Sequence, residues 1–416
     1  MMRAPPSARR PRDPVAARRR RELWRAVYLP TVVLSLAEGM LVPVLPLYVA
    51  DLGAGFALVG LALAAEAIGM LLGDVPAGSI LRRFDRKVVM LTGVGVVGVA
   101  VAAIPLFGSV VAVIVLRLVA GLGAAMWGLS RHAYLTESVE PASRGRSIAA
   151  FGGANRIGML LGPALGGVVA GAFGFGAAFI AFGIVAALAF GLCALYLEPR
   201  SATETGPRQR MGHREALRHV LVQQRRLLIT AGAGQLFAQM IRSGRRIVLP
   251  LYGSALLGLD VQAIGWVLSI AAAFDVALFP VAGVVMDRWG RKAAIVPSFV
   301  IQALGMALVP LSGGVVGLAL AGAVIGLGNG IGSGTMMTIA SDLAPRDTVG
   351  EFLGVWRLIG DAGGMGGPVA VGAIADALTL ETATLVIAVI GLGAAATFAF
   401  GVPETLGRAP VAARRG

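Results

Sequence analysis

The residues of this chain that could do chemistry are charged side chains placed inside long apolar stretches. Five acids and seven arginines interrupt runs of about 20 hydrophobic residues, the length that spans a bilayer core as a helix. A charge in such surroundings is costly, so it normally faces a partner, a ligand or a water-filled space. Carboxyl groups there can carry protons, and guanidinium groups can bind anions. The twelve residues are Glu38, Glu66, Asp74, Asp275, Asp361, Arg117, Arg131, Arg156, Arg242, Arg245, Arg246 and Arg357.

Glu38 is the best candidate for proton coupling. It lies in the middle of its apolar stretch, shortly before Pro43 and Pro46. A carboxyl group whose surroundings alternate between water and protein interior can take up and release a proton. We expect Arg117 to lie nearby and to share this role. The alternative is a permanent Glu38–Arg117 ion pair that only holds the helices together.

Arg242, Arg245 and Arg246 have the spacing i, i+3 and i+4, so they share one face of a helix. Such a face suits an anionic or zwitterionic solute better than a lipophilic cation. We expect these arginines, with Glu66, to line a solute-binding cavity. In the alternative interpretation, Asp275 and Asp361 neutralise the arginines and no ligand is involved.

The composition indicates that water is not the main solvent of this chain. Hydrophobic residues make up 57% and charged residues 14%, against about 45–50% and about 25% in soluble domains. The 59 glycines allow helix backbones to approach closely in a membrane. One cysteine excludes an intramolecular disulfide, and three histidines give no Cys/His metal site, so no cofactor is expected.

Twelve apolar runs are long enough to cross a bilayer as helices. The fold class is therefore an all-α membrane protein with twelve transmembrane helices. The predicted spans are 27–49, 57–80, 88–107, 110–133, 147–171, 174–197, 227–250, 262–285, 293–311, 315–341, 352–375 and 381–402.

The positive charges are strongly one-sided. Seven of the 36 Lys and Arg residues lie in predicted spans, and all the others lie in the tails or in the even-to-odd connections. Because short cytoplasmic loops collect positive charge, both termini are predicted to be cytoplasmic in a multi-pass inner-membrane protein. The Arg-rich start has no secretory signal pattern, and the net charge of +14 reports orientation, not nucleic-acid binding.

A shift of 205 residues superimposes the two halves of the sequence, for example Gly162-Pro163 on Gly367-Pro368. The halves are therefore predicted to be two pseudo-repeated six-helix bundles with a binding site between them. The predicted organisation is a basic tail (1–26), an N-terminal bundle (27–197), a linker (198–226), a C-terminal bundle (227–402) and a second tail (403–416).

One loop signature points to a family. The loop between spans eight and nine resembles the cytoplasmic signature of the major facilitator superfamily, and the first-half copy is degenerate, with Arg82 and Asp85 in place of Asp and Gly. Asp287 is expected to accept hydrogen bonds at a neighbouring helix N-terminus in one conformation only. The signature residues are Gly283, Asp287, Arg288, Gly290, Arg291 and Lys292, and in the first copy Gly78, Asp85 and Arg86.

Three further segments are similar to superfamily signatures: Pro43–Tyr48, Arg117–Gly123 and Gly158–Gly167. The last is typical of proton-coupled drug antiporters, so the resemblance implies export of a drug-like solute. Independently, glycines at four-residue spacing leave a smooth ridge, and a proline in a helix bends it. Close packing alone, or a bend that seals one gate, would explain Gly158, Gly162, Pro163, Gly166 and Gly167.

Two charge pairs are expected across the bundle interface if the resemblance places spans five and eight, and spans two and eleven, side by side. Arg156 would meet Asp275, and Glu66 would meet Arg357, which has Asp361 one turn later. Pairs across a moving interface would act as gates. Pairing within each bundle is the alternative.

These features predict a secondary transporter that exports a small amphipathic or anionic solute in exchange for protons. Import of a sugar or organic acid is the alternative within transport, and a non-transporting receptor or scaffold is the alternative outside it. The sequence shows no nucleophile–base pair and no metal cluster of the kind that an enzyme would need, so an enzyme is not expected. The expected partners are a small-molecule substrate, protons and the lipid bilayer, with the protein acting as a monomer.

Overall fold

The computed structural model describes residues 24–138, 144–197, 213–345 and 347–407, and every regular element in these ranges is helical. Helices satisfy all backbone hydrogen bonds within one segment, which apolar surroundings require. The elements are η1 (Trp24–Tyr28), α2 (Leu29–Asp51), α3 (Phe56–Arg83), α4 (Arg86–Ala102), η2 (Ile104–Leu106), α5 (Val110–Ser138), α6 (Arg144–Phe173), α7 (Phe175–Tyr196), α8 (His213–Gln223), α9 (Arg225–Ala255), α10 (Val261–Trp289), α11 (Arg291–Leu308), η4 (Val309–Leu311), α12 (Val315–Ile331), α13 (Thr335–Leu343), α14 (Val349–Ala377), α15 (Leu380–Ala396) and η5 (Thr397–Gly401).

Eleven helical stretches in the described ranges are long and apolar enough to cross a membrane. Helix α9 is the remaining predicted span. It has 31 residues but is less apolar than the others, because its middle carries Arg242, Arg245 and Arg246. It packs against α14 and α15 like an ordinary bundle helix. The predicted all-α fold with twelve spanning helices in two bundles is thus confirmed.

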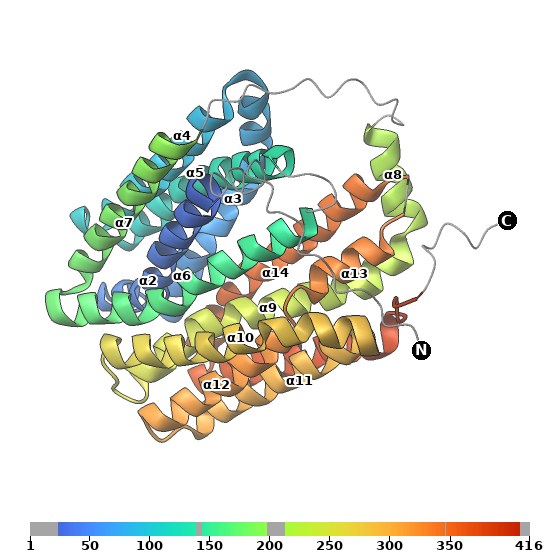
Figure 1. The fold of residues 1–416 in the computed structure, drawn as a ribbon. Coiled ribbons are helices and arrows are strands. Elements are labelled where there is room, and N and C mark those ends of the chain that lie inside the picture. The colour runs from blue at the N-terminus through green and yellow to red at the C-terminus, as the bar shows by residue number, and fades with distance from the viewer. Residues whose placement is uncertain (1–23, 139–143, 198–212, 346, 408–416) are drawn as a thin grey trace, which may run out of the picture.

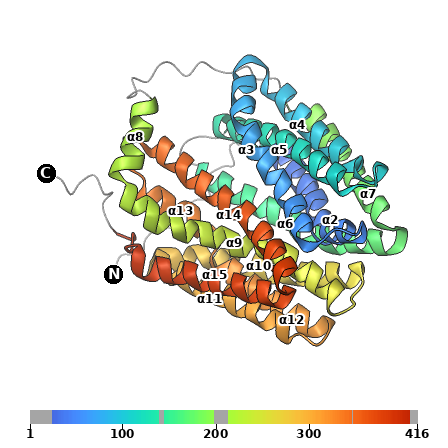
Figure 2. The same cartoon turned by 180° about the vertical axis from the view of Figure 1, so that it is seen from behind.

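Helices α2–α7 form the first bundle and α9–α15 the second (Figure 1). Two helix pairs make most of the contact between the bundles: α6 packs against α10, and α14 packs against α3. The view from behind shows α14 between α9 and the first bundle (Figure 2). We call the side where α7 ends and α9 begins the linker side, and the opposite side, where α2 ends and α3 begins, the far side.

The bundles touch backbone to backbone toward the far side. A Cβ atom at Gly60 of α3 would clash with the carbonyl oxygen of Pro368 in α14, and one at Gly372 with the carbonyl of Phe56. In the other pair, a Cβ at Gly265 of α10 would clash with the backbone of Pro163 in α6. Only glycine permits this approach, so these residues seal the far-side seam.

The linker-side ends of the same four helices are different. Within the described ranges, an added Cβ would meet no atom within 4 Å at their linker-side glycines, which are Gly78, Gly152, Gly153, Gly283, Gly350 and Gly354. The close backbone contact between bundles is therefore confined to the far side and the middle of the helices.

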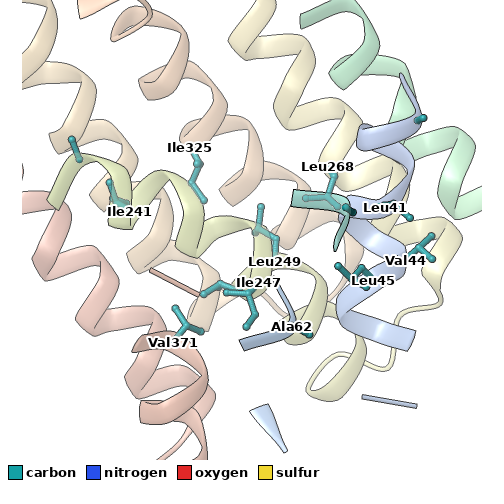
Figure 3. Packing of buried hydrophobic residues seen from close by; sticks show 14 of the residues in the cluster. Leu41, Val44, Leu45, Ala62, Ile241, Ile247, Leu249, Leu268, Ile325 and Val371 are labelled. Atoms are coloured by element: carbon teal, nitrogen blue, oxygen red, sulfur yellow. The ribbon is translucent and has the colours of Figure 1, made fainter. Parts of the chain in front are cut away.

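Apolar side chains from both bundles fill the region where the bundles meet (Figure 3). Leu41, Val44 and Leu45 come from α2, and Ile247 and Leu249 come from α9; all five are at most 5% exposed. Shape complementarity of these residues fixes how the two bundles sit against each other.

Predicted span ten is broken near its middle. Helix α12 ends at Ile331, and α13 begins at Thr335 after Gly334, whose φ of +76° favours glycine. At this break the carbonyl oxygen of Gly332 and the hydroxyl group of Ser333 also accept hydrogen bonds from side chains of other helices. Both contact arginines in the site described next.

Candidate functional site

Glu38 lies half-buried in the middle of α2. Within the described residues its carboxyl group has no hydrogen bond and no ion pair. It interacts electrostatically with Glu66 and with three arginines, Arg131, Arg246 and Arg117. Arg246 comes from the second bundle, so the carboxyl group responds to charges of both bundles.

Arg117 of α5 binds Glu66 of α3 in an ion pair within the first bundle, and its side chain is 8% exposed. The expected pair between Glu66 and Arg357 is therefore wrong, and so is the alternative of a Glu38–Arg117 pair. The physical reason is the tight packing of α3 on α5, where Gly121 lies against the backbone of Glu66. That contact brings the two side chains together and leaves Glu38 without a salt-bridge partner.

Arg131 of α5 is held by aromatic rings. Its guanidinium carbon lies 4.3 Å from the ring centre of Phe151 and 5.0 Å from that of Trp127. Its Nε atom is buried without a hydrogen-bond partner. Cation–π contact stabilises the charge but leaves it available to an anion.

The three arginines of α9 divide between two surroundings. Arg242 donates to the carbonyl oxygen of Gly332 at 3.1 Å and stacks over Phe299, with 5.2 Å to the ring centre. Arg242 and Arg245 both interact electrostatically with Asp275. Arg246 is exposed and acts on Glu38 instead. One helix face therefore links the acid of the first bundle to the acid of the second.

Asp275 of α10 is the centre of the second cluster and is 13% exposed. Arg156 of α6 lies 2.5 Å away, and Asn329 donates to the other carboxylate oxygen at 2.8 Å. Arg156 also donates to the Ser333 hydroxyl group at 2.6 Å. The expected contact between Arg156 and Asp275 is thus present, and it joins the two bundles in the middle of the α6–α10 seam.

Arg357 of α14 reaches Asp74 of α3 at 3.2 Å and its own neighbour Asp361 at 3.6 Å. Its side chain is 53% exposed, so these contacts are weaker than the buried pairs. A cross-bundle pair is present here as expected, with Asp74 in the place that the sequence assigned to Glu66. Asp74 lies two helical turns nearer the linker side than Glu66, which is where Arg357 lies.

The charges therefore do not balance. In the described part of the chain, five acids lie well inside the spans; four of them form ion pairs and Glu38 does not. Four arginines have no carboxylate within 4.0 Å: Arg131, Arg242, Arg245 and Arg246. A site with unmatched positive charge and one unpaired carboxyl group is suited to bind an anion and a proton.

The glycine ridge of α6 faces mainly α2, inside the first bundle. Cβ atoms at Gly158, Gly162 and Gly166 would clash with the backbone of Ser35, Gly39 and Met40. Two neighbours face the other bundle: Gly167 lies against Gly265, and Pro163 supplies the carbonyl there. The segment thus packs both within and between bundles.

The linker-side signature forms a different contact from the expected one. Asp287 is 79% exposed and pairs with Arg291 at 3.1 Å, and among the described residues it accepts no hydrogen bond from a neighbouring helix N-terminus. Glu404, beyond the last helix, takes that position and accepts from the backbone N–H groups of Arg291 at 2.9 Å and Lys292 at 3.0 Å. Gly290, with φ of +103°, leaves room for the Glu404 carboxylate.

Burial acts to raise the pKa of Glu404, but its bonds from backbone N–H groups outweigh burial, and the pKa lies below its ordinary value. Asp342, at the end of α13, accepts from Arg291 at 3.0 Å and from the Thr405 hydroxyl group at 2.7 Å. Lys292 donates to the carbonyl of Ala399 at 2.7 Å. Arg288 is exposed, and these bonds tie the linker-side end of the second bundle together.

In the first copy of the signature, Asp85 caps α4 by accepting from the N–H of Lys87 at 2.7 Å. Arg86 is buried, and Gly78 has open space around it. The copy thus acts as a helix cap within its own bundle.

Several polar residues that form contacts in these sites were not predicted from the sequence, because nothing in the local charge pattern distinguishes them. Ser269 accepts from the N–H of Ala164 at 2.9 Å across the α6–α10 seam, and Asp376 caps α3 from the other bundle. Asn329 and Ser333 lie in a glycine-rich stretch, which was the one available signal of an irregular helix.

The arrangement of two six-helix bundles, with charged residues between them, agrees with one family of known proteins. The family description "Major Facilitator Superfamily" matches residues 27–254 and 231–415. The chain belongs to the major facilitator superfamily. It is therefore a multi-pass membrane transporter of this type, as the loop signature predicted.

Several known proteins are similar to this chain at low identity. The uncharacterized MFS-type transporter MJ1560 of Methanocaldococcus jannaschii is 21% identical over 352 residues, which are 85% of this chain and 91% of that protein. A bacterial homologue of the human lysosomal transporter Spinster, in an inward-facing and unoccupied conformation, has a TM-score of 0.72 at 15% identity, over 92% of this chain and 97% of that one. The nucleoside transporter NupG has a TM-score of 0.75 at 13% identity, over 91% and 98%. These two structures are similar to this chain in fold.

Proposed function

We propose that this protein is a proton-coupled secondary transporter that moves a small amphipathic or anionic solute by alternating access. Glu38 carries the proposal, because among the five acids well inside the described spans it is the one that has no ion-pair partner. A carboxyl group held by a salt bridge stays ionised, whereas an unpaired, half-buried one changes its protonation when water reaches it. Proton uptake and release at Glu38 would then follow the opening of the site.

The unmatched arginines support an anionic group on the solute. Arg242, Arg245 and Arg246 share one face of α9, and among the described residues each lacks a carboxylate within 4.0 Å. A charge-assisted hydrogen bond to one of them contributes about 1.5–3 kcal/mol. The exposed Arg246 would contact the solute first.

Export is the direction that the drug-antiporter-like segment Gly158–Gly167 supports. Uptake of an organic acid is the second candidate, and the electrostatics of the site favour it. An anion bound by Arg246 would repel ionised Glu38 but not protonated Glu38. Two unit charges about 8 Å apart at an effective dielectric constant of about 20 interact by about 2 kcal/mol, so anion and proton would assist each other's binding about thirtyfold. Such coupling moves both in the same direction, whereas a cation would exchange with the proton.

We further propose that the linker side is the cytoplasmic face of the inner membrane and that both termini lie there, since the Lys and Arg residues outside the spans collect on that side. The sealed far-side seam then corresponds to a conformation that opens to the cytoplasm. One chain contains both bundles and every charge of the site, so a monomer would suffice for transport.

The test begins with a growth and susceptibility panel that compares a null host with one expressing the protein. Solutes that it identifies are then measured in proteoliposomes with an imposed pH gradient of either sign. Gradient-driven flux supports proton coupling, and its direction relative to the proton separates export from uptake. Binding without any flux would favour the receptor alternative and contradict the proposal.

A further inference from the structure

The start of α3 is capped by a residue from the other bundle. Asp376, at the far-side end of α14, accepts from the backbone N–H of Phe56 at 2.8 Å and from that of Ala57 at 2.9 Å. Each carboxylate oxygen takes one bond. The first N–H groups of a helix have no partner within the helix, so a carboxylate there acts as an N-cap.

The repeated half of the chain caps the equivalent helix differently. In the 205-residue register, α10 corresponds to α3, and Asp260 corresponds to Gly55. Asp260 precedes α10 in its own bundle and accepts from the N–H of Ala263 at 2.7 Å. Gly55 has no side chain to do this, so α3 depends on the carboxylate of Asp376.

The surroundings leave no room for a local cap in this conformation. A Cβ at Gly55 would lie 2.9 Å from an Asp376 carboxylate oxygen. One turn before Asp376, Gly372 lies against the backbone of Phe56 and Ala57, so the bonds form only when α14 and α3 are in close contact.

We infer that Asp376 is a far-side latch: its cap on α3 exists when the bundles are closed on that side and is lost when they separate there. The inference rests on the proposed alternating access. Removing the carboxylate weakens the closed state alone, whereas removing Asp260 weakens α10 in both states. Loss of the Asp376 cap should therefore raise the ratio of far-side-open to far-side-closed molecules about tenfold. Loss of the Asp260 cap should leave this ratio unchanged.

The experiment follows the rate at which a maleimide labels a cysteine in the seam. Ser269→Cys in a Cys193→Ala background serves as the reporter, because Ser269 is buried between α10 and α6. In nanodiscs, Asp376→Ala should label about tenfold faster than the background protein, and Asp260→Ala should label at the background rate while losing thermal stability. Equal labelling of all three proteins, or equal acceleration by both variants, overturns the latch.

A second variant separates the latch from simple loss of stability. Gly55→Asp combined with Asp376→Ala gives α3 its own cap, as in α10, in both states. We expect it to regain thermal stability while still labelling fast. If labelling returns to the background rate, Asp376 only stabilises the helix, and the inference fails. No solute is needed, so an absence of transport would contradict the proposed function without affecting this result.

Discussion

The guanidinium group of Arg156 lies 2.5 Å from the carboxylate of Asp275, and this contact joins the first bundle to the second at mid-membrane depth. Both side chains are largely buried; Asn329 donates to the second carboxylate oxygen of Asp275, and the Ser333 hydroxyl group accepts from Arg156. A buried ion pair of this kind stabilises the folded protein little compared with an apolar pair of the same size. Removal of one partner, however, leaves a buried charge uncompensated.

We therefore predict that Arg156→Leu or Asp275→Leu destabilises the protein by about 3–5 kcal/mol. The double variant should lose much less stability than the sum of the two single losses. Thermal unfolding in detergent measures this, with Arg288→Leu, an exposed arginine at the end of α10, as the control. Additive losses would mean that the two residues act independently.

Glu38→Gln should abolish uphill, gradient-driven transport while the protein remains folded and inserted. Gln keeps the size of the side chain but cannot carry a proton. Counterflow, which needs no gradient, should persist. Glu66→Gln is the matched comparison: because Glu66 is paired with Arg117, we expect lower stability there and retained proton dependence. Undiminished uphill transport by Glu38→Gln would remove Glu38 from the coupling step.

Arg246→Ala and Arg242→Ala should each weaken binding of an anionic solute about tenfold or more, since one charge-assisted contact is lost. Discrimination against cations should relax in parallel. Binding of benzoate and benzylammonium to purified protein in nanodiscs checks both effects, with Arg225→Ala at the exposed start of α9 as the control. If both variants retain the preference for the anion, or if the unmodified protein prefers the cation, the arginines are structural.

Glu404→Gln should lower stability by about 1–2 kcal/mol, because Glu404 caps α11. The pKa of Glu404 is lower in the folded protein, so this stabilisation is complete above the ordinary value of 4.5 and is lost as the pH falls through the lower, folded-state pKa. The difference in melting temperature between the unmodified protein and Glu404→Gln should therefore be constant near pH 7 and shrink in acid. Asp51→Asn, which replaces an exposed acid on the far side, serves as the control variant. A difference that persists at the lowest pH would rule out the carboxylate as the cause.

The sequence by itself determined the fold class, because the length and apolar character of a span are local properties, and they alone decide whether a segment can cross a bilayer as a helix. It also determined which residues are anomalous: a charge inside an apolar run is visible without any partner. The contact between Arg156 and Asp275 was expected from the resemblance to the superfamily, which places spans five and eight side by side, and the structure contains it.

Only the tertiary structure decided which acids Arg117 and Arg357 meet. Glu66 lies on the face of α3 that packs on α5, so it binds Arg117, and Arg357 is left to Asp74 nearer the linker side. The same holds for Glu404 and Asp376, which cap helices that begin 113 and 320 residues earlier in the chain. Helix rotation and the contact between bundles set these partners, and both depend on packing between segments far apart in sequence, which no local pattern records.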